Sequence, residues 1–421
     1  MARFDRSHTD DLAAFIKASP TPYHACAEAG RRLEAAGFER LTETEVWPAG
    51  NNSSDGYYVI RDGSIVAWRS PRETATGFRI FGAHTDTPTF KVKPRPDTGS
   101  AGWKQIAVEV YGGVPHQTWL DRDLGVAGRL VMRDGTEVLV DVDRPLLRIP
   151  RLAIHLDRGA NEGQKLNAQS QLTPIWGLGQ AREGEFLEFI AAEAGVDAAD
   201  VFGHDLFTVA LDEPAYLGKD RELFAAWRLD NLTGTHAGLA ALIAAEDTEQ
   251  APVFVSFNYE EIGSMTYSAA QGPFLETVLR RMFGEDYEMY ARTIAGSSMM
   301  SADTGNAIHP NYMEKHEPGH RPIPGAGPMI KVSANQRYAS GAEEQALFRR
   351  SAEAAGIPWQ MYVNRNDIPG GTTIGPISGT QLGILTVDVG LPILSMHSAR
   401  ELCGAEDPGR LADLALGLFT H

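Results

Sequence analysis

The sequence predicts an α/β fold in which helices and strands alternate, interrupted by a β-rich insertion. Helical patterns alternate with short apolar strand patterns from residue 227 onward, whereas strand patterns and turn signals dominate after residue 94. The length of 421 residues also exceeds what one hydrophobic core usually supports. We therefore expect one layered domain built from residues 1–94 and 218–421, and a second, inserted domain built from residues 95–217.

Two amphipathic helices are expected first, over residues 10–18 and 23–36. Pro20 and Pro22 separate them, and Gly37 ends the second. Apolar runs then predict three strands, at residues 57–60, 64–68 and 78–81.

The insertion is expected to be rich in strands, and the last part of the chain to alternate between helices and strands. Strands are predicted in the insertion at residues 105–111, 128–132 and 137–142, ahead of a mixed polar and helical stretch at 159–195. After residue 227, helices are predicted at 232–245, 274–283 and 342–355, and strands from 253 and at 297–302, 329–333 and 359–363.

Composition and charge exclude several classes of protein. With 43% hydrophobic and 22% charged residues the chain has ordinary globular composition, and its net charge of -17 would repel nucleic acids and anionic membranes. No apolar run approaches the roughly 18 residues needed to cross a bilayer. Cys26 and Cys403 are far apart in sequence, and the N-terminal residues lack a secretion-signal pattern. We therefore expect a cytoplasmic protein with neither nucleic-acid nor membrane partners.

The stretch at residues 253–261 carries the first sign of chemistry. Its apolar first half predicts a buried strand, and the strand ends at two adjacent carboxylates, Glu260 and Glu261. Ligands and catalytic groups collect at strand ends in α/β folds. One glutamate could therefore bind a cation while the other handles a proton. A solvated acidic turn is the alternative for this pair taken alone.

Other ligand-type residues also follow predicted strands or strand-like runs. With the two glutamates, the set is His84, Asp86, Asp230, Glu260, Glu261, Asp303 and His397. Histidines and carboxylates without cysteine suit zinc, manganese or cobalt, and the set exceeds what one tetrahedral ion can use. Two ions sharing one carboxylate would fit. They would lower the pKa of a bridging water and polarise a scissile carbonyl, while a carboxylate that binds neither ion removes the proton.

Each of these residues also has a structural alternative. The tripeptide His-Thr-Asp at residues 84–86 occurs again at residues 8–10, where we expect it to cap a helix. Asp230 with Asn231 could equally cap the helix predicted from residue 232, and Asp303 could open a turn. The recurrence of such residues at several strand ends of one region favours a common site.

Several longer motifs carry a family resemblance. They are GAHTDTPTFKVKP (82–94), EVYGG (109–113), TWLDRDLGVAGR (118–129), RIPRLAIHL (148–156), LDNLTG (229–234), NYEEIGS (258–264), SADTGNAIHPNYMEKHEPGHRP (301–322), IKVSANQRYAS (330–340), NDIPGGTTIGPI (366–377) and MHSARE (396–401). In this order they resemble the aspartyl aminopeptidase family of metallopeptidases over nearly the whole chain. The resemblance implies a metallo-exopeptidase catalytic domain with an inserted dimerisation and assembly domain.

The resemblance also implies roles for the candidate residues. The metal ligands would be His84, Asp230, Glu261, Asp303 and His397. Asp230 would bridge two divalent ions, most simply zinc with manganese or cobalt as alternatives. His84 and Asp303 would complete one site, and Glu261 and His397 the other. Glu260 would be the general base, and Asp86 would orient the His84 imidazole.

Substrate and assembly follow from the same resemblance. Members of the family remove an unblocked N-terminal Asp or Glu from peptides, and Lys331, with Tyr338 nearby, matches the positions that bind the acidic side chain. His155, in the insertion, would enter a neighbouring subunit's active site within a large homo-oligomer. A solvated strand-end lysine and a histidine with only a core role are the alternatives for Lys331 and His155.

The chain departs from the family pattern at two positions. Asn306 stands where many relatives have histidine, and Gly370 where some have cysteine, which puts pocket detail in doubt but leaves the metal ligands intact. Two rival functions stay open: a two-metal aminopeptidase or dipeptidase of neutral specificity, and a catalytically silent scaffold of the same fold. The complete ligand set with Glu260 argues against the scaffold.

Overall fold

The computed structural model describes residues 3–48, 56–69, 76–246, 248 and 250–420. Its contacts divide the chain into two compact units. The first unit comprises Met1–Asp86, Pro214–Met396 and Glu401–His421, and the second comprises Thr87–Glu213 and His397–Arg400. These units change after Asp86 and after Glu213. The sequence predicted both boundaries slightly later in the chain, after residues 94 and 217.

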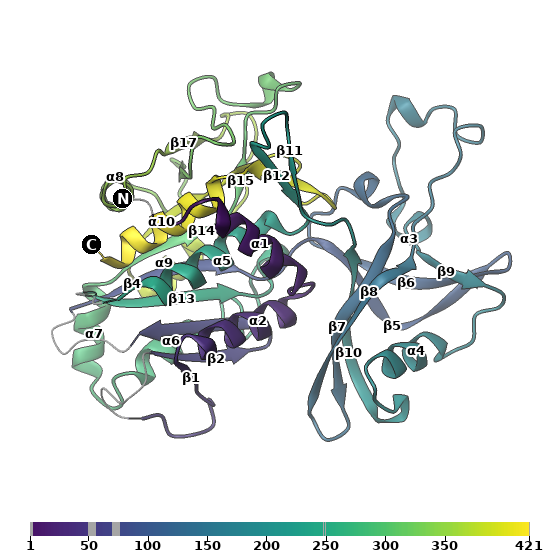
Figure 1. The fold of residues 1–421 in the computed structure, drawn as a ribbon, viewed down its shortest axis with the longest axis horizontal. Helices are drawn as coiled ribbons and strands as arrows, with labels where there is room; N and C mark the ends of the chain where they lie inside the picture. Colours follow the sequence, from purple (N-terminus) through teal and green to yellow (C-terminus); the bar gives the residue numbers. More distant parts are fainter. Residues whose placement is uncertain (1–2, 49–55, 70–75, 247, 249, 421) are drawn as a thin grey trace. The chain divides into compact units, whose positions relative to one another are not determined.

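The first unit is built around a nine-stranded sheet with the strand order β1-β2-β3-β13-β4-β14-β18-β16-β17 (Figure 1). The strands are β1 (Phe38–Arg40), β2 (Gly56–Arg61), β3 (Ser64–Arg69), β4 (Phe78–His84), β13 (Ala251–Phe257), β14 (Ser298–Ala302), β16 (Met329–Val332), β17 (Gln360–Val363) and β18 (Leu385–Gly390). Strands β13, β4, β14 and β18 run parallel. Their carboxyl ends therefore meet at one edge of the sheet.

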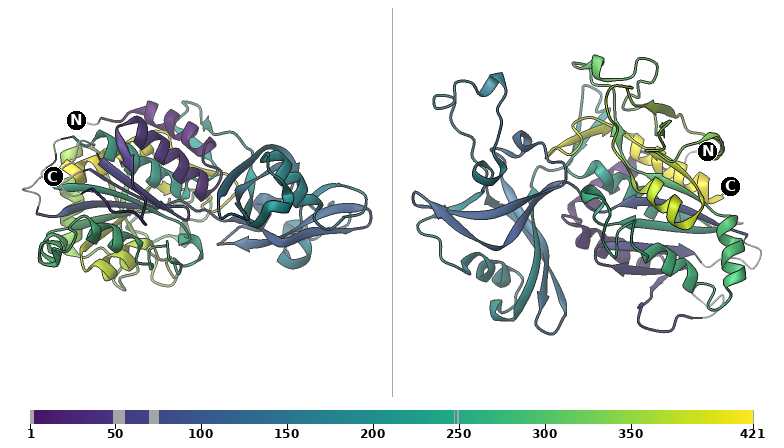
Figure 2. Two further views of the ribbon diagram at one scale, coloured as in Figure 1. Left: turned by 90° about the horizontal axis from the view of Figure 1, so that it is seen from below. Right: turned by 180° about the vertical axis from the view of Figure 1, so that it is seen from behind.

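Helices cover both faces of this sheet, which confirms the predicted layered α/β class (Figure 2). One core cluster includes residues of α1 (Arg6–Lys17), α2 (Pro22–Ala35), α5 (Leu229–Ala244), α8 (Ala342–Ala355) and α10 (Asp407–Thr420). The other includes residues of α6 (Phe274–Arg281), α7 (Tyr287–Ala295) and α9 (Ile374–Leu382). The apolar strands are buried on both sides, as expected of parallel strands between two helical layers.

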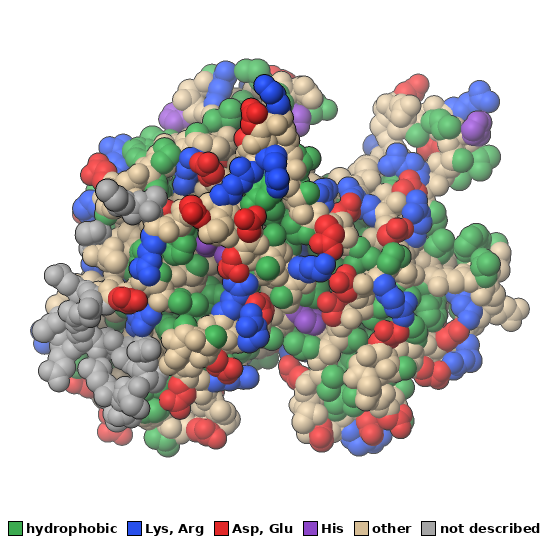
Figure 3. Space-filling view, in the orientation of Figure 1, with side chains coloured by type: hydrophobic (Ala, Val, Ile, Leu, Met, Phe, Trp, Pro, Cys, Tyr) green, Lys and Arg blue, Asp and Glu red, His purple; other side chains and the backbone are tan. Residues whose placement is uncertain are grey.

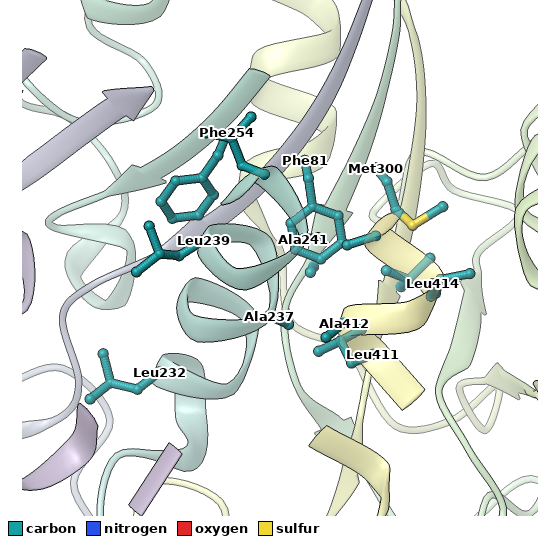
Figure 4. Packing of buried hydrophobic residues seen from close by; sticks show 14 of the residues in the cluster. Phe81, Leu232, Ala237, Leu239, Ala241, Phe254, Met300, Leu411, Ala412 and Leu414 are labelled. Carbon is teal, nitrogen blue, oxygen red and sulfur yellow. The ribbon is translucent and has the colours of Figure 1, made fainter. Parts of the chain in front are cut away.

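Alternation along the central strands supplies both cores. Phe81 of β4 and Phe254 of β13 belong to the first cluster, whereas their neighbours Ile80 and Val253 belong to the second. Figure 4 shows Phe81 and Phe254 beside helix α5, with Leu414 of α10 in the same cluster. This packing fixes β4 and β13, and therefore the residues that follow their ends.

Two smaller sheets complete the first unit. One joins β11 (Ala215–Leu217), β12 (Leu223–Ala226) and β20 (Glu401–Gly404), and the other joins β15 (Gly305–Asn306) and β19 (Pro392–Ile393). None of the helices in the described part of the chain is both long and apolar enough to cross a membrane. On the face drawn in Figure 3, acidic and basic side chains are interspersed.

The second unit contains a six-stranded antiparallel sheet with the order β8-β7-β10-β5-β6-β9. The strands are β5 (Thr89–Ser100), β6 (Trp103–Tyr111), β7 (Leu124–Met132), β8 (Glu137–Leu147), β9 (Ile175–Leu178) and β10 (Val201–Ala210), with the helices α3 (Ala168–Gln171) and α4 (Glu185–Glu193). A long segment between β8 and α3 projects away from this sheet (Figure 1). This unit is rich in strands, as its sequence indicates.

The first helix corrects one expectation. We expected residues 8–10 to cap a helix that begins at residue 10, but α1 begins at Arg6. Asp5 is the cap, because its carboxylate accepts the Ser7 backbone N–H at 2.8 Å. His8 instead lies inside the helix, where its Nε2 is 3.2 Å from Nδ1 of His236. The cap prediction was wrong because a better N-cap residue stands a few positions earlier.

Candidate metal centre

Three adjacent parallel strands deliver ligand-type side chains to one edge of the nine-stranded sheet. His84 is the last residue of β4, and Asp303 follows directly after β14. Glu260 and Glu261 begin the short 3-10 turn η4 (Glu260–Ile262) beyond β13. Because β4 pairs in parallel with both neighbours, these side chains converge.

Asp230 comes from an interruption at the start of α5. Its backbone is extended (φ -85°, ψ 103°), and Asn231 is also non-helical. The Asn231 side-chain oxygen accepts the Gly234 backbone N–H at 3.3 Å, so Asn231 is the residue that caps the continuing helix. Asp230 meets His84 instead, with its Oδ1 3.3 Å from the imidazole Nε2. The sequence left open whether this pair caps the helix or contributes a ligand. In the structure Asn231 caps the helix and Asp230 meets His84.

The His84 imidazole is the centre of the cluster. Its Nε2 lies 3.5 Å from Asp303 Oδ1 and 4.0 Å from Glu260 Oε2. Its Nδ1 faces Asp86, at 3.1 Å from the backbone carbonyl oxygen and 3.4 Å from Oδ1. One ring nitrogen therefore faces the carboxylates, and the other is held by Asp86.

Asp86 also holds the glutamate pair. Its Oδ1 accepts the backbone N–H of Glu260 and its Oδ2 accepts that of Glu261, both at 3.1 Å. Bonds of this kind to an ionised acceptor are stronger than neutral ones. One buried carboxylate thus connects the end of β4 to the turn that follows β13.

Several carboxylates lie close together in the cluster, and their mutual repulsion shifts the pKa values of its members. Burial raises the pKa of Glu260 to about 8; the charge of His84 opposes this, and those of Asp303, Asp86 and Asp230 add to it. Burial and the charges of Asp230 and Glu260 raise the pKa of Glu261 well above its ordinary value. Burial alone would lower the pKa of His84, but contacts with Asp230, Asp303 and Asp86 raise it well above its ordinary value. Each carboxylate would thus be stabilised in its charged form by a nearby cation.

The donor set fits a divalent metal ion. Ligand atoms of His84, Asp230 and Glu261 all lie within 4.8 Å of one another, and among the described residues no other set of three or more histidine, cysteine or acidic side chains meets this spacing. Two donors bound to one tetrahedral zinc ion at about 2.0–2.2 Å are roughly 3.3–3.6 Å apart, and the 3.3 Å between His84 Nε2 and Asp230 Oδ1 already matches this spacing. Imidazole and carboxylate ligands without sulfur suit zinc, manganese or cobalt.

Lys331 brings a buried cation to the edge of this cluster. It lies on β16, only 2% of it is exposed, and its Nζ is 3.2 Å from Asp303 Oδ2 and 5.4 Å from the centre of the Tyr338 ring. Burial alone would lower its pKa, but the charges of Asp303, Tyr338 and Asp388 raise it above its ordinary value. Lys331 therefore stays protonated, and a strand-end lysine exposed to solvent is excluded.

Two further predicted residues, His397 and His155, are described with the second unit. By its contacts His397 belongs to the second unit, where its Nδ1 is 3.2 Å from the Gly113 carbonyl oxygen. His155 is exposed in the segment between β8 and α3 of the same unit, so a buried core histidine is excluded. The structure therefore unites His84, Asp86, Asp230, Glu260, Glu261, Asp303, Lys331 and Tyr338 within the first unit, and describes His397 and His155 with the second.

The two departures from the family pattern have different settings. Asn306 is exposed on β15. At Gly370 an added Cβ would lie 1.9 Å from Asn364 Nδ2, so a larger residue there would require Asn364 to move.

Two buried acids beside the cluster were not predicted as site residues. Glu401 accepts the Asp230 backbone N–H at 2.9 Å, and Asp388 acts electrostatically on Lys331. Glu401 ends the motif MHSARE, so the sequence held a signal for it. Asp388 lies within an apolar strand, β18, and only its burial draws attention to it.

The chain is similar to known proteins over nearly its whole length. The profile of a family described as "Aminopeptidase I zinc metalloprotease (M18)" matches residues 15–419. A Streptomyces coelicolor protein named "Probable M18 family aminopeptidase 2" is 54% identical over 98% of this chain and 97% of its own length. The structure described as the Ape4 and Nbr1 complex has a TM-score of 0.93 at 34% identity, over 98% of this chain and 85% of that chain. The structure described as the S. cerevesiae mApe1 dodecamer has a TM-score of 0.85 at 27% identity, over 99% of this chain and 97% of that chain.

Proposed function

Since the chain belongs to the M18 family of metallo-aminopeptidases, we propose that it removes an unblocked N-terminal Asp or Glu from peptides. The aminopeptidase activity follows from the family, and the acidic specificity is the proposal. One observation carries it: the buried Nζ of Lys331 lies 3.2 Å from a carboxylate oxygen of Asp303 in the candidate metal centre. A fixed positive charge beside the reactive groups suits a substrate whose first side chain is negative.

Five residues would hold two divalent metal ions, most simply zinc. His84 and Asp303 would hold one ion, Glu261 and His397 would hold the other, and Asp230 would contribute to both. Supporting this assignment, the donor atoms of His84, Asp230 and Glu261 already lie within 4.8 Å of one another. When bound, such ions lower the pKa of a water and polarise the peptide carbonyl.

Glu260 would act as the general base. Its Oε2 is the most distant of the three carboxylate oxygens that face His84 Nε2, at 4.0 Å against 3.3 Å for Asp230 and 3.5 Å for Asp303. Asp86 holds its backbone N–H, so the carboxylate stays next to the ligands without having to be one of them. There Glu260 can take a proton from the attacking water and return it to the departing amine.

Lys331 would receive the acidic side chain of the substrate. Its ion pair with Asp303 already holds the ammonium in place. Substrate binding would therefore lose little additional side-chain entropy at Lys331. Tyr338 packs near the same ammonium and would close one side of the subsite. A purely structural ion pair between Lys331 and Asp303 is the competing explanation, and it corresponds to an aminopeptidase or dipeptidase of neutral specificity.

The remaining proposals concern assembly and location. A structural neighbour is described as a dodecamer, and on that basis we propose a large homo-oligomer in which His155 reaches a neighbouring subunit's site. The exposure of His155 is compatible with this role. Cys26 and Cys403 are both buried free thiols, as a reducing compartment would keep them, and a cytoplasmic location is proposed accordingly.

The test is a substrate panel on the zinc-loaded protein and on Lys331→Met. Chromogenic substrates with N-terminal Asp, Glu, Ala, Leu and Lys are compared, with N-acetyl-Asp as the blocked control. The Lys331→Met variant should lose roughly 1.5–3 kcal/mol in kcat/KM on Asp and Glu substrates, because a charge-assisted bond is removed. Neutral substrates should lose much less. A uniform loss across the panel would make Lys331 structural and favour the neutral-specificity alternative.

A further inference from the structure

Arg228 is a buried arginine for which the reaction described above has no role. It precedes α5 and is only 1% exposed. Its backbone is left-handed (φ 68°, ψ 25°), a conformation that residues other than glycine rarely adopt and that persists where the surroundings enforce it. A buried guanidinium at such a turn requires specific partners.

Its hydrogen bonds reach the strand end that carries His84. One terminal nitrogen donates to the Thr85 carbonyl oxygen at 2.6 Å, and the other donates to the Ser19 carbonyl oxygen. Thr85 stands between His84 and Asp86, and its own N–H donates to the Phe257 carbonyl of β13 at 2.7 Å. Arg228 therefore fixes the peptide group between Thr85 and Asp86, one residue beyond the proposed ligand His84.

Two carboxylates that hold other parts of the centre act on the same guanidinium. The acids whose charges act on Arg228 are Asp86 and Glu401. Asp86 holds the backbone N–H groups of Glu260 and Glu261, and Glu401 holds that of Asp230. Arg228 is thus electrostatically linked to both halves of the donor set, the strand ends and the start of α5.

We infer that Arg228 is a positioning residue that keeps the strand-end ligands and Asp230 at metal-binding distance. This inference rests on the ligand set proposed above. It assigns Glu401 a partner role, because the Glu401 charge offsets that of Arg228 while its Oε2 orients the Asp230 backbone. The competing explanation is a structural anchor that holds only the α1–α2 connection through Ser19.

The experiment compares zinc affinity and melting temperature of Arg228→Met and Arg228→Lys with the wild type. Zinc affinity is measured by competition with a chromogenic chelator, and Tm on the metal-free protein. Arg69→Met is the matched control, because Arg69 also donates to two backbone carbonyls, those of Leu242 at 3.0 Å and Ile243 at 2.6 Å. These carbonyls lie at the opposite end of α5 from Asp230.

Arg228→Met should weaken zinc binding about 10- to 100-fold, the usual effect of losing a group that orients metal ligands. Arg228→Lys should lose less, since lysine keeps the charge. Arg69→Met should lower Tm and leave zinc affinity unchanged. Zinc affinity of Arg228→Met within twofold of the wild type, whatever its Tm, would overturn the inference.

Two further variants keep the result decisive. If Arg228→Met does not fold, Arg228→Lys and Glu401→Gln replace it, and wild-type zinc affinity in both would overturn the inference. Glu261→Gln is measured alongside to test the ligand set itself. Zinc retained by Glu261→Gln would reject the ligand set and the inference that rests on it, whereas zinc lost there but unchanged in the Arg228 variants would reject only the role of Arg228.

Discussion

Replacement of Asp86 by Asn tests how the glutamate pair is held. The two Asp86 oxygens accept the backbone N–H groups of Glu260 and Glu261, each at 3.1 Å. Asn has nearly the same shape but only one oxygen, so its amide group would point a donor at one of these N–H groups. One hydrogen bond is lost, the other is no longer charge-assisted, and the turn carrying both glutamates should loosen.

The expected loss follows from the strength of that bond. A hydrogen bond to a charged group contributes about 1.5–3 kcal/mol, and about 1.4 kcal/mol corresponds to a tenfold change in rate. If the loss falls on the transition state, kcat/KM of Asp86→Asn should decrease roughly 10- to 150-fold. The decrease should be similar for all substrates, because Asp86 contacts His84 and the turn that carries the glutamates, whereas Lys331 would receive the substrate side chain.

The assay is kcat/KM on an N-terminal Asp substrate, with zinc content and Tm measured on the same preparations. Asp407→Asn is the matched control, because Asp407 is fully buried and its two oxygens accept the backbone N–H groups of Gly325 and Gly327 at 2.6 and 3.1 Å. Both variants should lose stability. A decrease in kcat/KM for Asp86→Asn no larger than that for Asp407→Asn would refute the proposed positioning role.

Three more outcomes are expected. Mixing inactive His155→Ala and Glu260→Gln proteins, dissociating them and reassembling them should restore part of the activity, because a chain with intact Glu260 then receives His155 from its neighbour; verified hybrids as inactive as their parents would contradict a shared site. Chelating the metal should lower Tm, since a ligand at about 1,000 times its Kd adds roughly 4 kcal/mol to the free energy of unfolding, and an unchanged Tm would contradict tight binding. Burial lowers the pKa of His8 to about 2 and of His24 to about 4, so as pH falls from 7 to 5 the unfolded chain binds protons there that the folded chain does not, and stability decreases by up to about 1.4 kcal/mol per pH unit for each. His8→Gln and His24→Gln should each make this decrease shallower, and an unchanged slope would contradict the reasoning.

Strands and ligands at strand ends were predictable because the signal is local. The apolar run from residue 253 is a strand in the structure, and the two carboxylates after it lie at the candidate metal centre. The pattern could not separate Asp230 from Asn231, since either side chain can cap a helix. Only the three-dimensional positions show that Asn231 caps and Asp230 meets His84.

Other features depend on contacts distant in sequence. The guanidinium of Arg228 binds carbonyls of Ser19 and Thr85, and no local pattern indicates such partners. Strand β5 escaped prediction because Pro94 and Pro96 interrupt its pattern. Both prolines fall where the pairing of β5 with β6 shifts register, between Val92 and Asp97, so they break no regular ladder bond.

The central claim is that two adjacent glutamates divide the work, Glu261 binding metal and Glu260 moving the proton. The most direct measurement is the metal content per chain of Glu260→Gln and Glu261→Gln, determined by mass spectrometry alongside kcat on an N-terminal Asp substrate. Glu260→Gln should keep the wild-type metal content and lose about 100- to 10,000-fold in rate, the usual contribution of general acid-base catalysis. Glu261→Gln should lose metal. Equal metal loss in the two variants, or a Glu260→Gln protein that retains wild-type kcat, would contradict this division of roles.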